Sequence, residues 1–80
     1  MKVKVLAFGI AKDIFGAPDA SVDLGDNPNV GDMKAALELQ YPRLGQLASY
    51  MVAVNNEYAD SDVVLSEADE IAIIPPVSGG

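Results

Sequence analysis

The chemistry available to this sequence is limited, because its 80 residues include no Cys and no His. Thiol redox chemistry, disulfides, imidazole catalysis and the commonest zinc sites are therefore excluded. Carboxylates, hydroxyls, lysines and the chain termini remain. The C-terminal stretch "IAIIPPVSGG" ends in Gly79 and Gly80, which have no side chain to pack and add nothing to stability. This ending is either an accident or the working part of the protein.

Two other groups of side chains near this end could do chemistry. Ser78 is better interpreted as a small polar spacer than as a nucleophile, because no His or Lys stands beside it to activate it. The acids of "SEADE" (Glu67, Asp69 and Glu70) resemble a metal cluster. Calcium-type loops need wider ligand spacing and a tight Gly turn, so a solvated turn is the better interpretation. We expect no bound metal and no bound cofactor.

Length and charge restrict the possible functions. Eighty residues make one domain with one modest core and no room for an enclosed active-site cleft. The net charge is −7, and all five bases precede Leu44, so the second half is purely acidic. Nucleic acid and anionic membranes would be repelled, whereas a basic protein partner would be attracted. The alternative is that this charge only keeps a small domain soluble.

The sequence shows no sign of membrane insertion or export. No apolar run approaches the roughly 18 residues of a membrane-spanning helix. The N-terminal stretch "MKVKV" alternates charged and apolar residues instead of forming the apolar block of a signal peptide. We expect a cytoplasmic protein.

Strand periodicity marks the first part of the chain. "KVKVLAF", Lys2 to Phe8, places its valines on one face and its lysines on the other. "GIAKDIFGAPDA" contains two glycines and a proline around a short apolar pair, which predicts a single helical turn or a compact loop. "SVDL", Ser21 to Leu24, is predicted to be a second strand that pairs with the first.

One long helix is predicted for "VGDMKAALELQY", Val30 to Tyr41. Asn29 is a suitable N-cap and Asp32 follows three residues later, as in a capping box. An apolar stripe recurs at helical spacing and ends before Pro42. It is predicted to face the core and consists of Val30, Met33, Leu37 and Tyr41.

The last third of the chain reads as strand, turn, strand, short apolar segment, strand. Asn55 and Asn56 both tolerate the positive φ of a tight hairpin. "IAII" is almost continuously apolar, which predicts a central strand that is covered on both sides or deeply paired. Pro75 and Pro76 cannot donate ladder hydrogen bonds, so they are expected to end the sheet and direct the chain outward.

This order of elements fits an α+β fold of the ubiquitin-like β-grasp type, a mixed sheet packed on one main helix, with the first and last strands adjacent in the middle. We expect residues 1–76 to form the β-grasp domain and residues 77–80 to form a flexible Gly-Gly tail.

The whole chain resembles the small subunit of molybdopterin synthase, a ubiquitin-like sulfur carrier. The similar stretches are "FGIAKDIFG", "LELQYPRL" and "VNNEYADSDVVLSEADEIAIIPPVSGG", of which the final "IPPVSGG" is the most specific. The resemblance implies that a ubiquitin-activating-like adenylyltransferase uses ATP to adenylate the carboxylate of Gly80, which then becomes a thiocarboxylate. The tail would enter the large synthase subunit and give its sulfur to a cyclic pyranopterin precursor for molybdenum cofactor.

The same resemblance assigns roles to the tail and to partners. Gly80 would be the reactive end, and the residues before it (Pro75, Pro76, Val77, Ser78 and Gly79) would thread the partner's active site. Catalysis would come from the large subunit, within a heterotetramer. Phe8, Ile10 and Phe15 belong either to the core or to an exposed patch that docks a partner. Two alternatives remain: a sulfur carrier for thiamin thiazole synthesis, and a ubiquitin-like modifier attached to lysines.

Overall fold

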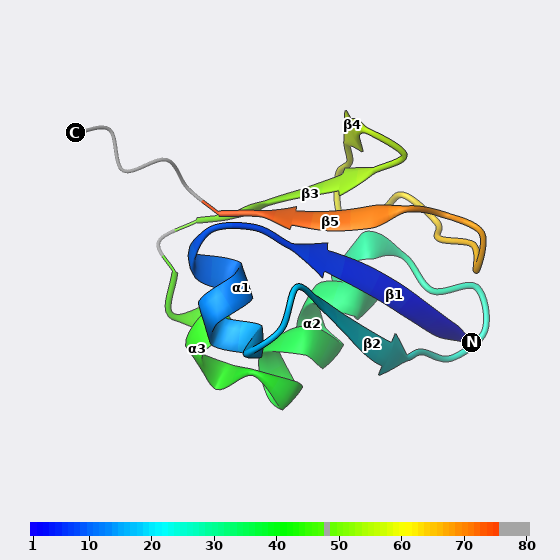
Figure 1. Ribbon diagram of the computed structural model, residues 1–80. Coiled ribbons are helices and arrows are strands. Elements are labelled where there is room, and N and C mark those ends of the chain that lie inside the picture. Colours follow the sequence, from blue (N-terminus) through cyan, green and yellow to red (C-terminus); the bar gives the residue numbers. More distant parts are fainter. Residues whose placement is uncertain (48, 76–80) are drawn as a thin grey trace.

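The computed structural model describes residues 1–47 and 49–75, which form five strands and three helices (Figure 1). The predicted tail residues Pro76 to Gly80 therefore lie outside the described part of the chain. The elements in chain order are β1 (Lys2–Ala7), α1 (Ile10–Phe15), β2 (Asp19–Asp23), α2 (Val30–Gln40), α3 (Pro42–Gly45), β3 (Met51–Val54), β4 (Glu57–Tyr58) and β5 (Ile71–Ile74).

The strands form one mixed sheet in the order β2-β1-β5-β3-β4. β1 and β5 pair in parallel, with Val5 opposite Ile71 and Ala7 opposite Ile73. The other neighbouring strands pair antiparallel. The first and last strands thus lie side by side in the centre, which confirms the predicted α+β fold of the ubiquitin-like β-grasp type.

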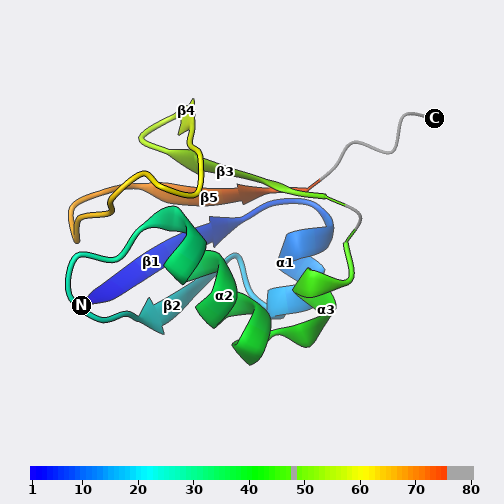
Figure 2. The ribbon, with the colours of Figure 1, turned by 180° about the vertical axis from the view of Figure 1, so that it is seen from behind.

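The three helices lie on one side of this sheet, as the view from behind shows (Figure 2). Side chains alternate across a strand, so every second residue of β1 and β5 faces the helices. Val5, Ile71 and Ile73 are fully buried there. Ala72 and Ile74 point to the other face and keep partial exposure. The apolar run of β5 therefore reflects deep pairing, and no described element covers its second face.

The first turn of α2 contains the predicted capping box. The Asp32 backbone N–H donates to Asn29 Oδ1 at 2.8 Å, and the Asn29 N–H donates to Asp32 Oδ2 at 3.0 Å. Two amides that the helix leaves without partners are thereby satisfied. Three members of the predicted stripe, Val30, Met33 and Leu37, are buried, whereas the fourth, Tyr41, follows the end of α2 and is partly buried against the core.

The segments that flank α2 differ in detail from the sequence prediction. The predicted turn or loop before β2 is the six-residue helix α1, which buries Ala11 and Phe15. The connection after α2 is the short helix α3, in which Pro42 occupies the first turn and Leu44 is buried. Proline has no N–H, which suits the first position of a helix but not the interior of one. Pro42 therefore stops α2 from continuing and also begins α3.

The hairpin between β3 and β4 turns at Asn55 and Asn56, whose φ angles are +53° and +69°. The Asn55 side chain also fixes the segment before β5. Its Nδ2 donates to Asp69 Oδ1 at 3.0 Å, and its Oδ1 accepts from the Glu70 N–H at 3.0 Å. The hairpin turn therefore holds the approach to the central strand. Among the described residues, no helix has both the length and the apolar character to cross a membrane.

The buried stripe of α2 predicts a sharp contrast between two leucines of the same helix. Leu37 is fully buried, whereas Leu39 is 85% exposed. We expect Leu37→Ala to lower the free energy of unfolding by about 2 to 5 kcal/mol through cavity formation. Leu39→Ala should change it by less than about 0.5 kcal/mol, because it removes little buried contact. Urea unfolding of both variants measures this, and similar losses would contradict the packing described.

Candidate functional site

The candidate site is the end of the sheet at which β5 stops. Ile74 is paired with Met51 at the start of β3, and Ala7 at the end of β1 is paired with Ile73. Pro75 follows as the last described residue and is partly buried. The C-terminal segment therefore starts from the middle of the sheet, between the end of β1 and the start of β3. The N-terminus and the end of β5 lie at opposite ends of the sheet (Figure 1).

The sheet face that the helices leave uncovered is apolar at this end. A shallow hollow of about 380 Å³ lies on it, and it is lined by side chains from four strands, by the residue after β1 and by the polar residues Asn56 and Glu70. We call the apolar part of this lining the apolar face, and it comprises Leu6, Phe8, Ala53, Tyr58, Ala72 and Ile74. Phe8 is 50% exposed and Tyr58 is 69% exposed. Such a group of exposed apolar side chains is typical of an interaction surface.

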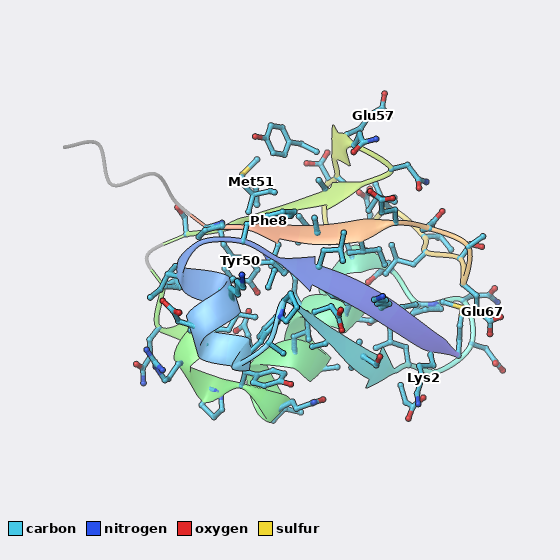
Figure 3. The ribbon with its side chains drawn as sticks, viewed as in Figure 1. Lys2, Phe8, Tyr50, Met51, Glu57 and Glu67 are labelled. Atoms are coloured by element: carbon cyan, nitrogen blue, oxygen red, sulfur yellow. The ribbon has the colours of Figure 1, made fainter. Side chains whose placement is uncertain are left out.

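Charged side chains accompany the apolar face. Asp19 is opposite Leu6 at the start of β2 and its carboxylate lies 3.8 Å from Lys4, and both side chains are well exposed, so solvent weakens this ion pair. Lys2 and Glu67 lie at the end of the sheet where β1 starts, whereas Phe8 and Met51 lie at the end where β5 stops (Figure 3). The apolar face adjoins Pro75 and has the Lys4–Asp19 ion pair beside it.

Tyr50 anchors the start of β3 to α2 on the helix side of the sheet. Its hydroxyl donates to Glu38 Oε2 at 2.5 Å, and the Lys34 ammonium lies 4.9 Å from its ring centre. Burial raises the pKa of Tyr50, and the hydrogen bond and negative charge of Glu38 raise it further. The neutral hydroxyl is thereby favoured as donor. This contact holds Tyr50 and hence the neighbouring Met51 at the edge of the apolar face.

The three candidate docking residues separate in the structure. Phe8 and Ile10 are 50% and 40% exposed, so both are accessible to a partner. Phe15 is buried in the core, with its ring centre 4.6 Å from that of Tyr41. Of the two possibilities left open by the sequence, Phe15 therefore belongs to the core, because helix α1 turns it toward α2 and α3 instead of toward solvent.

The acidic turn before β5 has a structural use. Asp69 accepts from the Ser66 backbone N–H at 2.8 Å through Oδ2 and from Asn55 through Oδ1. Both oxygens of this carboxylate are thus occupied by protein donors. Within the described residues, no group of three or more acidic side chains is arranged to hold a metal ion.

The sequence prediction missed most of the apolar face. Leu6, Tyr58 and Ile74 of this face, and Met51 at its edge, were not recognised as surface residues, because an apolar residue in a strand looks the same on either face. One signal was present: Val5, Ile71 and Ile73 alternate with these positions, and a one-sided sheet must expose one of the two sets. The tail residues (Pro76, Val77, Ser78, Gly79 and Gly80) lie outside the described part.

The ThiS family profile matches residues 5–80 of this chain. The molybdopterin synthase sulfur carrier subunit of Arabidopsis thaliana is 35% identical over 81 residues, covering 100% of this chain and 84% of that protein. The corresponding subunit of Chlamydomonas reinhardtii is also 35% identical, and the alignment covers 100% of both chains.

Solved structures with a similar fold include proteins related to these carriers. SAMP1 from Haloferax volcanii superposes with a TM-score of 0.86 at 27% identity, covering 100% of both chains. A chain from the complex of subunits 1 and 2 of molybdopterin-converting factor from Helicobacter pylori superposes with a TM-score of 0.70 at 26% identity, again over 100% of both chains. This chain therefore belongs to the ThiS family, among members that are similar to molybdopterin synthase sulfur carrier subunits.

Proposed function

We propose that this protein carries sulfur as a thiocarboxylate on Gly80 and donates it within a molybdopterin synthase. The observation that carries the proposal is the junction at Pro75. The buried core of the described residues ends at Ile73, and Pro75, the residue before "PVSGG", follows β5 in the middle of the sheet, next to Ile74 of the apolar face. Similarity to sulfur carrier subunits along the full chain supports this reading.

The chemistry of the proposal uses the C-terminal carboxylate alone. A carboxylate oxygen of Gly80 attacks the α-phosphorus of ATP, pyrophosphate leaves, and an acyl-adenylate forms on a separate ubiquitin-activating-like enzyme. A sulfur nucleophile then attacks the acyl carbon and AMP leaves, so the carbonyl keeps one sulfur in place of one oxygen. Glycine suits this position because no side chain shields the acyl carbon and a narrow channel admits it.

The proposed recipient is the large subunit of a molybdopterin synthase. A structural neighbour comes from a complex of subunits 1 and 2 of molybdopterin-converting factor, which supports a partner of this kind. The apolar face is the docking surface we propose, because it adjoins the start of the tail. Binding of the partner to this face would hold its active site near the start of the tail, which lowers the entropic cost of inserting the tail.

The charge of the chain indicates what should surround the docking site on the partner. All six acids after Arg43 lack a compensating base in that half of the sequence. A basic rim around an apolar patch would therefore complement this protein, with charge accelerating encounter and apolar burial holding the complex.

A second candidate function is that of a ubiquitin-like protein modifier. The small archaeal modifier protein 1 of Haloferax volcanii superposes with a TM-score of 0.83 at 25% identity. Both functions begin with the same acyl-adenylate and differ in the final nucleophile, which is sulfur in one case and a lysine amine in the other.

The first expected outcome concerns activation. With ATP and a cognate activating enzyme, the chain should release pyrophosphate, and with a sulfur source its intact mass should rise by the replacement of one oxygen with sulfur. A variant without Gly79 and Gly80 should do neither. Its melting temperature should match that of the full chain, because the buried core of the described residues ends at Ile73. Equal activation of the truncated variant would refute the proposal.

The second expected outcome concerns docking. Phe8→Ala should weaken binding to the large subunit about tenfold, as expected when an aromatic anchor is removed. Leu39→Ala is the matched control, because Leu39 is more exposed than Phe8 but lies on α2, behind the sheet. Calorimetric titration of both variants measures the difference. Equal affinity for the two variants would place the docking surface elsewhere.

The third expected outcome separates the two candidate functions. If sulfur transfer is the function, protein isolated from its own cells should carry the thiocarboxylate mass and no covalent conjugates. Conjugates on lysines of other proteins, detected on denaturing gels as species of higher mass that contain this chain, would instead support the modifier function. Their complete loss in the variant without Gly79 and Gly80 would show that they depend on this terminus.

A further inference from the structure

Gly9 forms a sharp corner between β1 and α1. Its φ and ψ are +56° and −132°, and the Ala11 N–H donates to the Phe8 carbonyl at 3.1 Å across the corner. These are the features of a type II′ turn with glycine at its first central position. A residue with a Cβ adopts this conformation only with strain.

The same corner touches the start of the C-terminal segment. A Cβ built on Gly9 would lie 3.2 Å from Cγ of Pro75, and among the described residues no other heavy atom outside its chain neighbours would be within 4 Å of it. This contact arises from the β1–β5 register, in which Ala7 is opposite Ile73, so the residues two positions further along both strands meet. The Pro75 ring therefore lies over the side of Gly9 on which a Cβ would stand.

We infer that the contact between Gly9 and Pro75 is a positioning device for the C-terminal segment, and this inference rests on the proposed sulfur-carrier function. Proline fixes its own φ, so seating its ring leaves few directions for the chain that follows. Gly9 is a positioning residue here, since it acts through Pro75 and touches no reacting atom.

The corner also relates the direction of the tail to the docking surface. Phe8 precedes Gly9 and belongs to the apolar face, so one turn places both a docking side chain and the support for Pro75. A partner docked on Phe8 would therefore meet the tail at a fixed offset. A methyl group at residue 9 would push the Pro75 ring away and so move the start of the tail relative to the docked partner. Small displacements of a reacting group lower the reaction rate strongly, so sulfur transfer should slow.

The isolated protein tests the geometry without reference to any reaction. Nuclear Overhauser contacts between the Gly9 Hα and Pro75 Hγ protons are expected. Residual dipolar couplings of the Val77 to Gly80 amides should differ from zero in the wild type and change in Gly9→Ala. Absence of the Overhauser contact, or couplings that are identical in both proteins, would overturn the inference.

Sulfur transfer to the large subunit tests the consequence. Gly9→Ala should lower kcat about tenfold, whereas KM for the carrier should change less than about twofold, because docking through the apolar face persists. Gly16→Ala is the matched control, since Gly16 also has a positive φ, +71°, but a Cβ there would meet no heavy atom of the described residues within 4 Å. It should transfer sulfur at the wild-type rate.

Rescue separates positioning from backbone strain. In a Pro75→Ala background the ring is absent, so adding Gly9→Ala should change kcat by less than about twofold relative to Pro75→Ala alone. Strain at residue 9 is the same in both backgrounds, so a persistent tenfold loss would assign the effect to strain and overturn the inference. Unfolding curves for every variant verify that each is folded in the assay.

The outcomes also distinguish this inference from the proposed function. If the wild type transfers sulfur and Gly9→Ala does so equally fast, the positioning role fails and the carrier function stands. If no variant transfers sulfur while the Overhauser contact and dipolar couplings behave as expected, the carrier function fails and the geometric device stands.

Discussion

The parallel pairing of β1 with β5 is the constraint on which the other features of this protein depend. It brings the two ends of the folded chain into the centre of the sheet and places Val5, Ile71 and Ile73 in the core together. The antiparallel neighbours β2 and β3 are then added outside this pair. Because the strands run the same way, β5 finishes where β1 finishes. The corner after β1 and the segment after β5 consequently meet, and the chain leaves the domain from a rigid central position instead of from an edge.

Local signals in the sequence predicted much of this fold. The Asn29 and Asp32 pair, the two asparagines of the hairpin and the prolines after the last strand each act within a few residues, so their effects follow from the sequence alone. Features that depend on tertiary packing were less accessible. Phe15 was compatible with core or surface until the orientation of α1 toward Tyr41 was known. The helix α3 was missed because four residues are too short for a periodic pattern.

The candidate site divides in the same way. The glycine pair and the prolines were proposed as site residues from their types and order, and of these only Pro75 is among the described residues. The apolar face was instead assembled from strands far apart in the sequence. Leu6 and Ile74 become neighbours of Tyr58 only through the strand order, which no local pattern contains. The proximity of Gly9 and Pro75 was the feature least predictable from the sequence, because glycine has no side chain whose chemistry would indicate a role.

The lateral edges of the sheet have a consequence for how copies of this protein behave in a crowded solution. At one edge β4 has only two residues, so it presents too few backbone groups to template a further strand. At the other edge β2 begins and ends with aspartates, and a second β2 strand approaching it would meet like charge. Growth of the sheet into a filament is thereby opposed at both sides, even though one face is apolar. The protein can therefore expose its apolar face and still resist strand-by-strand polymerisation.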